Sequence, residues 1–197
     1  GACRVLVEER SRTFIDYAYR RFCHFTQDSG EIVWMSERDG WSHLYLYDAV
    51  TGQVKHRITG GEWVVRSVEH VDDEARQVWF LASGRHDGQD PYYLHLCRIG
   101  FDGEGFVELT DGDGTHSISF SPDRRYFVDT WSRVDAPPES VLRHSEDGSP
   151  ALELERADWA DLRATGWEPP EQFVAKGRDG VTDIHGVIWR PRDLDPG

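Results

Sequence analysis

The stretch "EIVWMSERDGWSHLYLYD", Glu31 to Asp48, holds two apolar runs on either side of the polar link "SERDG". Short apolar runs separated by a Gly-containing polar link are typical of two β-strands joined by a turn. A second Gly turn and a third run, "VKHRIT", follow directly. The stretch therefore predicts consecutive antiparallel strands, and a repetition of this unit would determine the architecture.

The unit does recur, in "RQVWFLASGRHDGQDPYYLHLCRIGFDGEGFVELT" from Arg76 and in "RYFVDTWSRVDAPPESVLRHSEDGSPALELE" from Arg125. A further apolar run and an acidic turn precede each copy: "FCHFTQDSG", "RSVEHVDDEA" and "ISFSPDRR". The period of about 45 to 50 residues is that of four-stranded propeller blades, which bury their faces by stacking. We expect an all-β fold, a partial β-propeller of about three antiparallel blades. Strands near Ile32–Met35, Val78–Leu81 and Phe127–Thr130 should lie in three different sheets.

Three blades do not close a ring, because propellers have roughly 4 to 8. The chain is therefore expected to be part of a larger propeller in a longer protein, and an open antiparallel β-sandwich is the alternative. The segments "CRVLVEE" and "TFIDYAYR", ahead of the first full unit, are expected to form the end of another blade.

The repeat stops after the third unit. "RADWADLRATG" has helical spacing and ends on Gly166, a residue suited to a helix C-terminus. Two apolar runs follow, Glu171 to Lys176 and Asp183 to Trp189, joined by an "RDG" turn. They predict a β-hairpin outside the blade stack. The expected domains are a partial propeller (residues 1–156), a linker with a short helix (157–168) and the first hairpin of a second domain (169–197).

Composition limits the classes of partner. The formal net charge of −14 argues against nucleic acid, because phosphate binding needs a basic surface. No apolar run approaches the roughly 20 residues that span a bilayer, so no membrane segment is expected in this chain. The three cysteines, Cys3, Cys23 and Cys97, lack zinc spacing and are expected to be small buried apolar residues. The compartment stays open.

Three stretches, in this order, resemble the dipeptidyl peptidase IV branch of the prolyl oligopeptidase family. "HFTQDSGEIVWMSERDGWSHLYLYD" and "LTDGDGTHSISFSPDRRYFVDTWSRVDAPP" are similar to its late propeller blades. "PEQFVAKGRDGVTDIHGVIWRPRDLDP" is similar to the hairpin that begins its α/β-hydrolase domain. The resemblance implies a serine exopeptidase that removes N-terminal dipeptides, with a propeller that gates and positions the peptide substrate. It implies no cofactor, and a Ser–Asp–His triad in a hydrolase domain outside this chain.

The chain alone is expected to be inactive. It contains no G-x-S-x-G, the motif whose glycines permit the strained nucleophile turn, so no catalytic residue is predicted. Ser29, Ser83 and Ser149 each adjoin one glycine and are interpreted as turn residues. The alternatives are a stand-alone propeller that binds proteins or peptides, and the propeller of an oligopeptidase or acylaminoacyl peptidase. Self-association along open blade edges is a further expectation.

Histidines and carboxylates are the remaining candidates for site residues. His116 is expected to be a hydrogen-bonded structural residue, and His185 to have no catalytic role. Five further histidines are scattered without metal-ligand spacing and are expected at polar or edge positions: His24, His43, His86, His95 and His144. No metal site is therefore predicted. The family binds the substrate amine with a glutamate pair, but Glu8 and Glu9 lack its context and are interpreted as solvated charges at a strand end. Polar turns, rather than calcium loops, are expected at Asp72–Glu74 and Asp111–Gly114. Substrate-binding residues stay unidentified.

Overall fold

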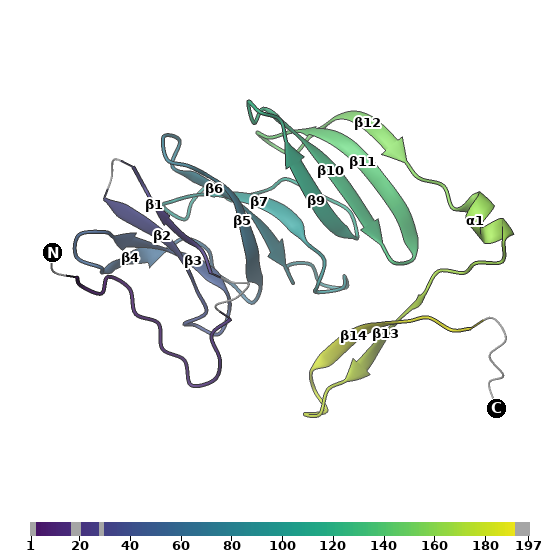
Figure 1. The fold of residues 1–197 in the computed structure, drawn as a ribbon, viewed down its shortest axis with the longest axis horizontal. Coiled ribbons are helices and arrows are strands. Elements are labelled where there is room, and N and C mark those ends of the chain that lie inside the picture. Colours follow the sequence, from purple (N-terminus) through teal and green to yellow (C-terminus); the bar gives the residue numbers. More distant parts are fainter. Residues whose placement is uncertain (1–2, 17–20, 28–29, 192–197) are drawn as a thin grey trace.

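Three four-stranded antiparallel sheets stand side by side in the computed structural model, which describes residues 3–16, 21–27 and 30–191 (Figure 1). The first blade contains β1 (Cys23–Phe25), β2 (Glu31–Ser36), β3 (His43–Asp48) and β4 (Val54–Arg57). The second contains β5 (Val64–Asp72), β6 (Gln77–Ser83), β7 (His95–Gly100) and β8 (Val107–Glu108). The third contains β9 (Thr115–Phe120), β10 (Tyr126–Arg133), β11 (Ala136–His144) and β12 (Pro150–Arg156).

Strand order in every blade follows chain order, so each blade is a simple meander. The stretch that opens the repeat forms β2 and β3, which pair from Glu31 opposite Asp48 to Ser36 opposite His43. The corresponding strands β6 and β10 lie in the other two sheets. The predicted fold class, three antiparallel blades of four strands, is confirmed.

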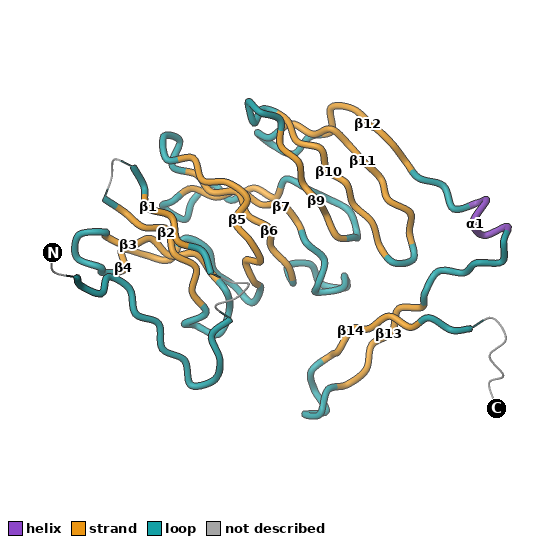
Figure 2. Tube along the Cα trace, in the orientation of Figure 1, coloured by secondary structure: helices purple, strands orange, loops and turns teal. Residues whose placement is uncertain are grey.

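The chain leaves the blades through α1 (Ala160–Ala164) and ends in a two-stranded sheet of β13 (Glu171–Lys176) and β14 (Asp183–Ile188) (Figure 2). Gly166 follows the helix with a φ of 80° and donates to the carbonyl of Arg163, as its predicted role requires. At the hairpin turn, the Asp179 side chain accepts from the backbone of Val181 and Thr182. The hairpin lies outside the blades, as predicted.

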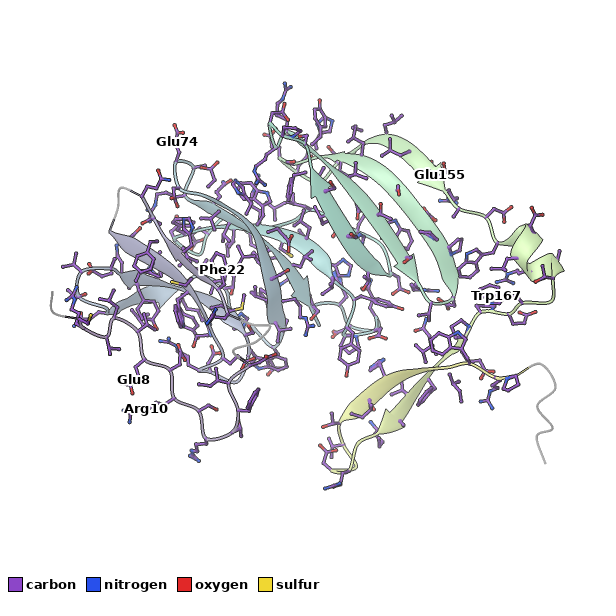
Figure 3. The ribbon with its side chains drawn as sticks, in the orientation of Figure 1. Glu8, Arg10, Phe22, Glu74, Glu155 and Trp167 are labelled. Atoms are coloured by element: carbon purple, nitrogen blue, oxygen red, sulfur yellow. The ribbon has the colours of Figure 1, made fainter. Side chains whose placement is uncertain are left out.

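Apolar side chains join the first two blades. Trp63 and Phe80 stack with ring centroids 6.0 Å apart, and Cys97 is fully buried beside them. The rest of this core comes from β2, β3 and the residue after β4 on one side, and from β5, β6, β7 and the residue after β7 on the other. It consists of Val33, Met35, Leu44, Leu46, Ile58, Val65, Val78, Ala82, Ile99 and Phe101. Phe22, labelled in Figure 3, packs against its edge. Burial between blades, rather than within one sheet, stabilises the fold.

A smaller apolar core joins the second and third blades, and a buried ionic network lies within the third blade. Trp79, Leu96, Leu109 and Phe127 form the core. The network centres on the fully buried Asp129 carboxylate, which accepts from His116 Nδ1 at 2.7 Å and from Arg143 Nε at 2.9 Å. The prediction of a hydrogen-bonded structural role for His116 is confirmed.

Glu31 provides a second buried ionic link, between the first two blades. Its carboxylate accepts from Arg76 Nη1 at 2.8 Å and from the Lys55 ammonium. Burial alone would raise the pKa of Glu31, but the two cations together hold it below its ordinary value. The carboxylate is therefore charged at neutral pH.

The expectation of a preceding blade end at the N-terminus is wrong for the described part of that segment, since residues 3–16 contain no strand. Leu6 and Val7 instead pack on Ile32, Tyr45 and Tyr47, on the face of the first blade opposite the second. The polar run "EERSRT" separates the two apolar pieces, and among the described residues no strand pairs with this segment. The segment covers this face as an irregular strap. Residues 17–20 lie outside the described residues.

The strap runs close over one turn. A Cβ atom on Gly52 would lie 2.3 Å from the carbonyl oxygen of Leu6, and Gly52 has a φ of 74°. Both the space and the backbone conformation therefore require glycine at this position. Among the described residues, no helix is long and apolar enough to cross a membrane.

Candidate functional site

A cavity of about 590 Å³ lies between the strap and the end of β2. The strap contributes Val7 and residues 9–15, and the blade side contributes Arg21, residues 34–38 and Gly40. Glu8 and Arg10 are labelled in Figure 3 and mark this segment. Their side chains form an exposed ion pair with an N–O distance of 2.7 Å.

Glu9 anchors the strap to the blade. Its Oε1 accepts from Trp34 Nε1 at 3.0 Å and from Arg38 Nη2 at 2.7 Å, and its Oε2 accepts from Ser36 Oγ at 3.0 Å. The interpretation of Glu9 as a solvated charge at a strand end is therefore wrong, although Glu8 is exposed. The sequence concealed the anchor because its three partners lie more than 20 positions further along the chain.

Arg38 is held in place by the same network. Burial alone would lower the pKa of its guanidinium, but hydrogen bonds to the Tyr47 hydroxyl and to Glu9 raise it. The guanidinium also lies 4.4 Å from the centroid of the Tyr45 ring, a cation–π distance. Glu9 accepts three hydrogen bonds from the blade, so it fixes the position of Arg38.

The rest of the lining combines positive charge with apolar surface. Arg12 and Arg21 line the cavity, and neither has an ion pair among the described residues. Phe14, Ile15 and Met35 supply apolar area. Guanidinium groups bind carbonyl and carboxylate oxygens, and the apolar walls accept side chains. The cavity, which Glu9 and Glu37 also line, is therefore suited to an extended peptide.

A second cluster lies at the junction of the second and third blades. His86 in the link after β6, His95 at the start of β7 and Glu108 at the end of β8 bring one ligand atom each to within 4.8 Å of one another. His86 Nε2 lies 2.5 Å from Glu108 Oε1, and His95 Nδ1 lies 3.7 Å from the same oxygen. The expectation of polar or edge positions is thus wrong for His95, which is buried. Burial lowers the pKa of His95 to about 4, so its imidazole is neutral.

The other candidate histidines lie outside this cluster. His43 is buried and bonds Thr59 and the carbonyl of Gly61, and burial lowers its pKa. His24 pairs with Asp73 at 2.8 Å, and His144 stacks on a tyrosine of the same blade. His185 lies on β14, and its Nδ1 is 4.0 Å from the Asp90 carboxylate, in the link between β6 and β7. This is a contact between the hairpin and the second blade.

The predictions for the serines and cysteines are right for some of these residues and wrong for others. Ser149 lies in a turn, bonded to Asp147, but Ser83 is the buried last residue of β6 and pairs with Val64. Ser29 lies outside the described residues. Cys97 is buried as expected, whereas Cys3 and Cys23 are exposed, contrary to expectation.

Both acidic turns make protein contacts. Asp72 caps its own turn through the backbone N–H of Ala75. In the second turn, Asp111 and Asp113 bind Arg143 and Arg133, respectively, which are arginines of the third blade. Polar turns, as predicted, describe both segments.

The chain is similar to known proteins in both sequence and fold. Residues 1–138 match the family described as the dipeptidyl peptidase IV (DPP IV) N-terminal region. Dipeptidyl peptidase 8 of Mus musculus is 24% identical over 226 aligned residues, covering 98% of this chain and 25% of that protein. A probable dipeptidyl peptidase 4 of Aspergillus flavus is 28% identical over 146 residues, covering 69% of this chain and 18% of that protein.

Among solved structures, a putative dipeptidyl aminopeptidase IV from Bacteroides ovatus superposes with a TM-score of 0.66 at 21% identity, over 88% of this chain and 27% of that one. The chain thus spans about a quarter or less of the length of the curated relatives named above. The match to the family extends through all strands of the first two blades and into β11 of the third. The blades, their order and this match together show that the chain belongs to the dipeptidyl peptidase IV N-terminal region family.

Proposed function

We propose that this propeller segment limits access to a serine-peptidase domain outside the chain and helps to position peptide substrates for it. The cavity under the strap carries the proposal. It combines apolar walls with the guanidinium groups of Arg12 and Arg21, which suit the side chains and carbonyl oxygens of a peptide. Its rigid side is fixed by the contact between Glu9 and Arg38.

The C-terminal hairpin supports the same proposal. Phe173, Ile184 and Trp189 are substantially exposed, although they are large and apolar. In a stand-alone propeller, a hairpin of this kind would have no apolar partner. An additional domain that continues the β13–β14 sheet would cover it, in agreement with the proposed boundary near residue 169.

The test uses the longer protein that contains this chain, with Arg12→Gln and Arg21→Gln combined. If the cavity positions peptides, KM for a Gly-Pro or Ala-Pro peptide of several residues should rise about tenfold, which corresponds to about 1.4 kcal/mol. The kcat value, and both constants for a short chromogenic Gly-Pro substrate, should stay close to those of the parent, because the proposal has the cavity contact only the longer peptide.

Arg163→Gln, on the exposed helix α1, is the matched control and should change neither constant. Equal KM values for the double variant and the control would contradict the proposed role of the cavity. The 197-residue chain alone should neither hydrolyse these substrates nor react with a fluorophosphonate probe, because no nucleophile elbow is present. Stoichiometric labelling of a serine would overturn that part.

A further inference from the structure

The cluster of His86, His95 and Glu108 has no place in the proposed peptide-positioning role. Its residues come from three separate pieces of the second blade: a link, the start of β7 and the end of β8. Two imidazoles and one carboxylate are a ligand set used by zinc and related first-row metals. The question is whether the donor atoms are prepared for a cation or are satisfied by the protein.

His95 is the informative residue. Gln89 donates from its side-chain amide to the carbonyl of Gly112 at 3.2 Å, which turns its oxygen toward His95. That oxygen lies 3.0 Å from His95 Nε2, so Nε2 carries the proton. The proton is thereby removed from Nδ1, which keeps a lone pair.

This lone pair lacks a protein donor. Nδ1 of His95 is buried and has no hydrogen-bond partner among the described residues, and the whole side chain is only 2% exposed. A buried acceptor without a partner is costly, and an oriented imidazole whose outer nitrogen is bonded to a fixed oxygen is the usual arrangement of a metal ligand. His95 Nδ1 faces Glu108 Oε1 at 3.7 Å.

Glu108 is oriented by a similar outer contact. Arg85 donates to its Oε2 at 3.3 Å and stacks over the rings of Trp63 and Phe106. This leaves Oε1 directed at both histidines. The positive charge of Arg85 weakens the attraction of the carboxylate for a cation, so moderate rather than extreme affinity is expected.

We propose that His86 Nε2, His95 Nδ1 and Glu108 Oε1 bind one divalent first-row metal ion, with zinc as the representative, and that water fills the remaining position. Zinc bonds of about 2.0–2.1 Å place tetrahedral ligands about 3.3 Å apart. The distance from His95 to Glu108 needs little change, and His86 must move away from the carboxylate oxygen. His86 can do so, because its side chain is 39% exposed on a link.

The test titrates the full 197-residue chain with zinc chloride after removal of metals by a chelator. Cys3→Ser and Cys23→Ser are introduced throughout, because both thiols are exposed and would bind zinc themselves. Calorimetry should give one zinc per chain. His86→Ala and Glu108→Gln should each weaken binding at least tenfold, and His144→Ala, a histidine outside the cluster, should leave affinity unchanged.

Two further measurements separate this site from scattered surface binding. Zinc should shift the Nδ1 resonance of His95 in imidazole nitrogen spectra, and cobalt in place of zinc should give the strong visible absorption of a four-coordinate site. Thermal unfolding of each metal-free variant verifies that it is folded. Equal zinc affinity in His86→Ala and His144→Ala, or an unchanged His95 Nδ1 resonance at saturation, would overturn the proposal. Failure to bind stoichiometric zinc would do the same, and would assign the orphan nitrogen to a buried water.

Discussion

Replacing Asp129 by asparagine is expected to destabilise the third blade strongly. The carboxylate is fully buried and contacts His116 and Arg143. Asparagine has nearly the same shape, so no cavity forms and the change is mainly the loss of one negative charge. Arg143 is itself buried and would then keep its positive charge without its inner partner.

The magnitude follows from the geometry. Removing one member of a buried ion pair costs about 3–5 kcal/mol, because the other charge stays buried. Arg143 retains the carbonyl of Gly148 at 3.0 Å and the exposed carboxylate of Asp111, which reduces the loss. We therefore expect about 3 kcal/mol, which is more than a hundredfold in the folding equilibrium.

The assay is urea unfolding at pH 7, followed by tryptophan fluorescence and by circular dichroism. Asp113→Asn is the matched control, since it removes the same charge from the solvent-accessible pair with Arg133 and should cost about 0–1 kcal/mol. Asp129→Leu combined with Arg143→Met should recover part of the loss, because no unpaired charge is left. If Asp129→Asn costs no more than the control, the argument that a buried unpaired guanidinium is costly here is refuted.

Three shorter predictions concern packing, thiol reactivity and pH. Phe80→Ala should cost about 3–5 kcal/mol, against about 1 kcal/mol or less for Phe173→Ala on the exposed hairpin, and similar losses would contradict the blade-to-blade core. Burial raises the pKa of Cys97, so an alkylating reagent at pH 8 should modify exposed Cys3 and spare Cys97 until urea unfolds the chain; early modification of Cys97 would contradict this. The folded-state pKa of Glu31 is lowered, so its contribution to stability is present above about pH 4.5 and is lost as the pH falls through the folded value. The stability gap between the parent and Glu31→Gln in urea melts should therefore be largest at pH 7 and narrow toward pH 3, and a gap that does not change with pH would exclude this ion pair as its cause.

The blades could be predicted from the sequence because their determinants are local. Each strand of the opening stretch is a short apolar run, and each turn contains glycine, so the register from Glu31 to Asp48 follows from neighbouring residues alone. The hairpin after Glu171 was predictable for the same reason. The apolar residues Leu6 and Val7 led to the wrong prediction of a strand. A strand also needs a hydrogen-bonding backbone partner, and the sequence of the strap does not show that this partner is missing.

Neither candidate site could be predicted in this way. The Glu9 anchor joins residues 25 to 29 positions apart, and the metal-type cluster joins His86, His95 and Glu108 with no short ligand spacing. Both depend on how the strap and the blades pack, which is a tertiary property. Histidine density gave no signal, because His86, His95 and His116 are spaced no more closely than His43, His56 and His70.

The meander order of the blades also determines how the protein can be made. Since all four strands of a sheet are consecutive in the chain, each blade has its complete set of hydrogen-bonding partners before the next is synthesised. The ribosome therefore releases finished sheets one at a time, and each new sheet meets a surface that already exists. The strap, which precedes the first blade in the chain, covers the face of that blade opposite the second. For the three blades, the order in the chain is therefore also the order in which complete sheets become available for packing.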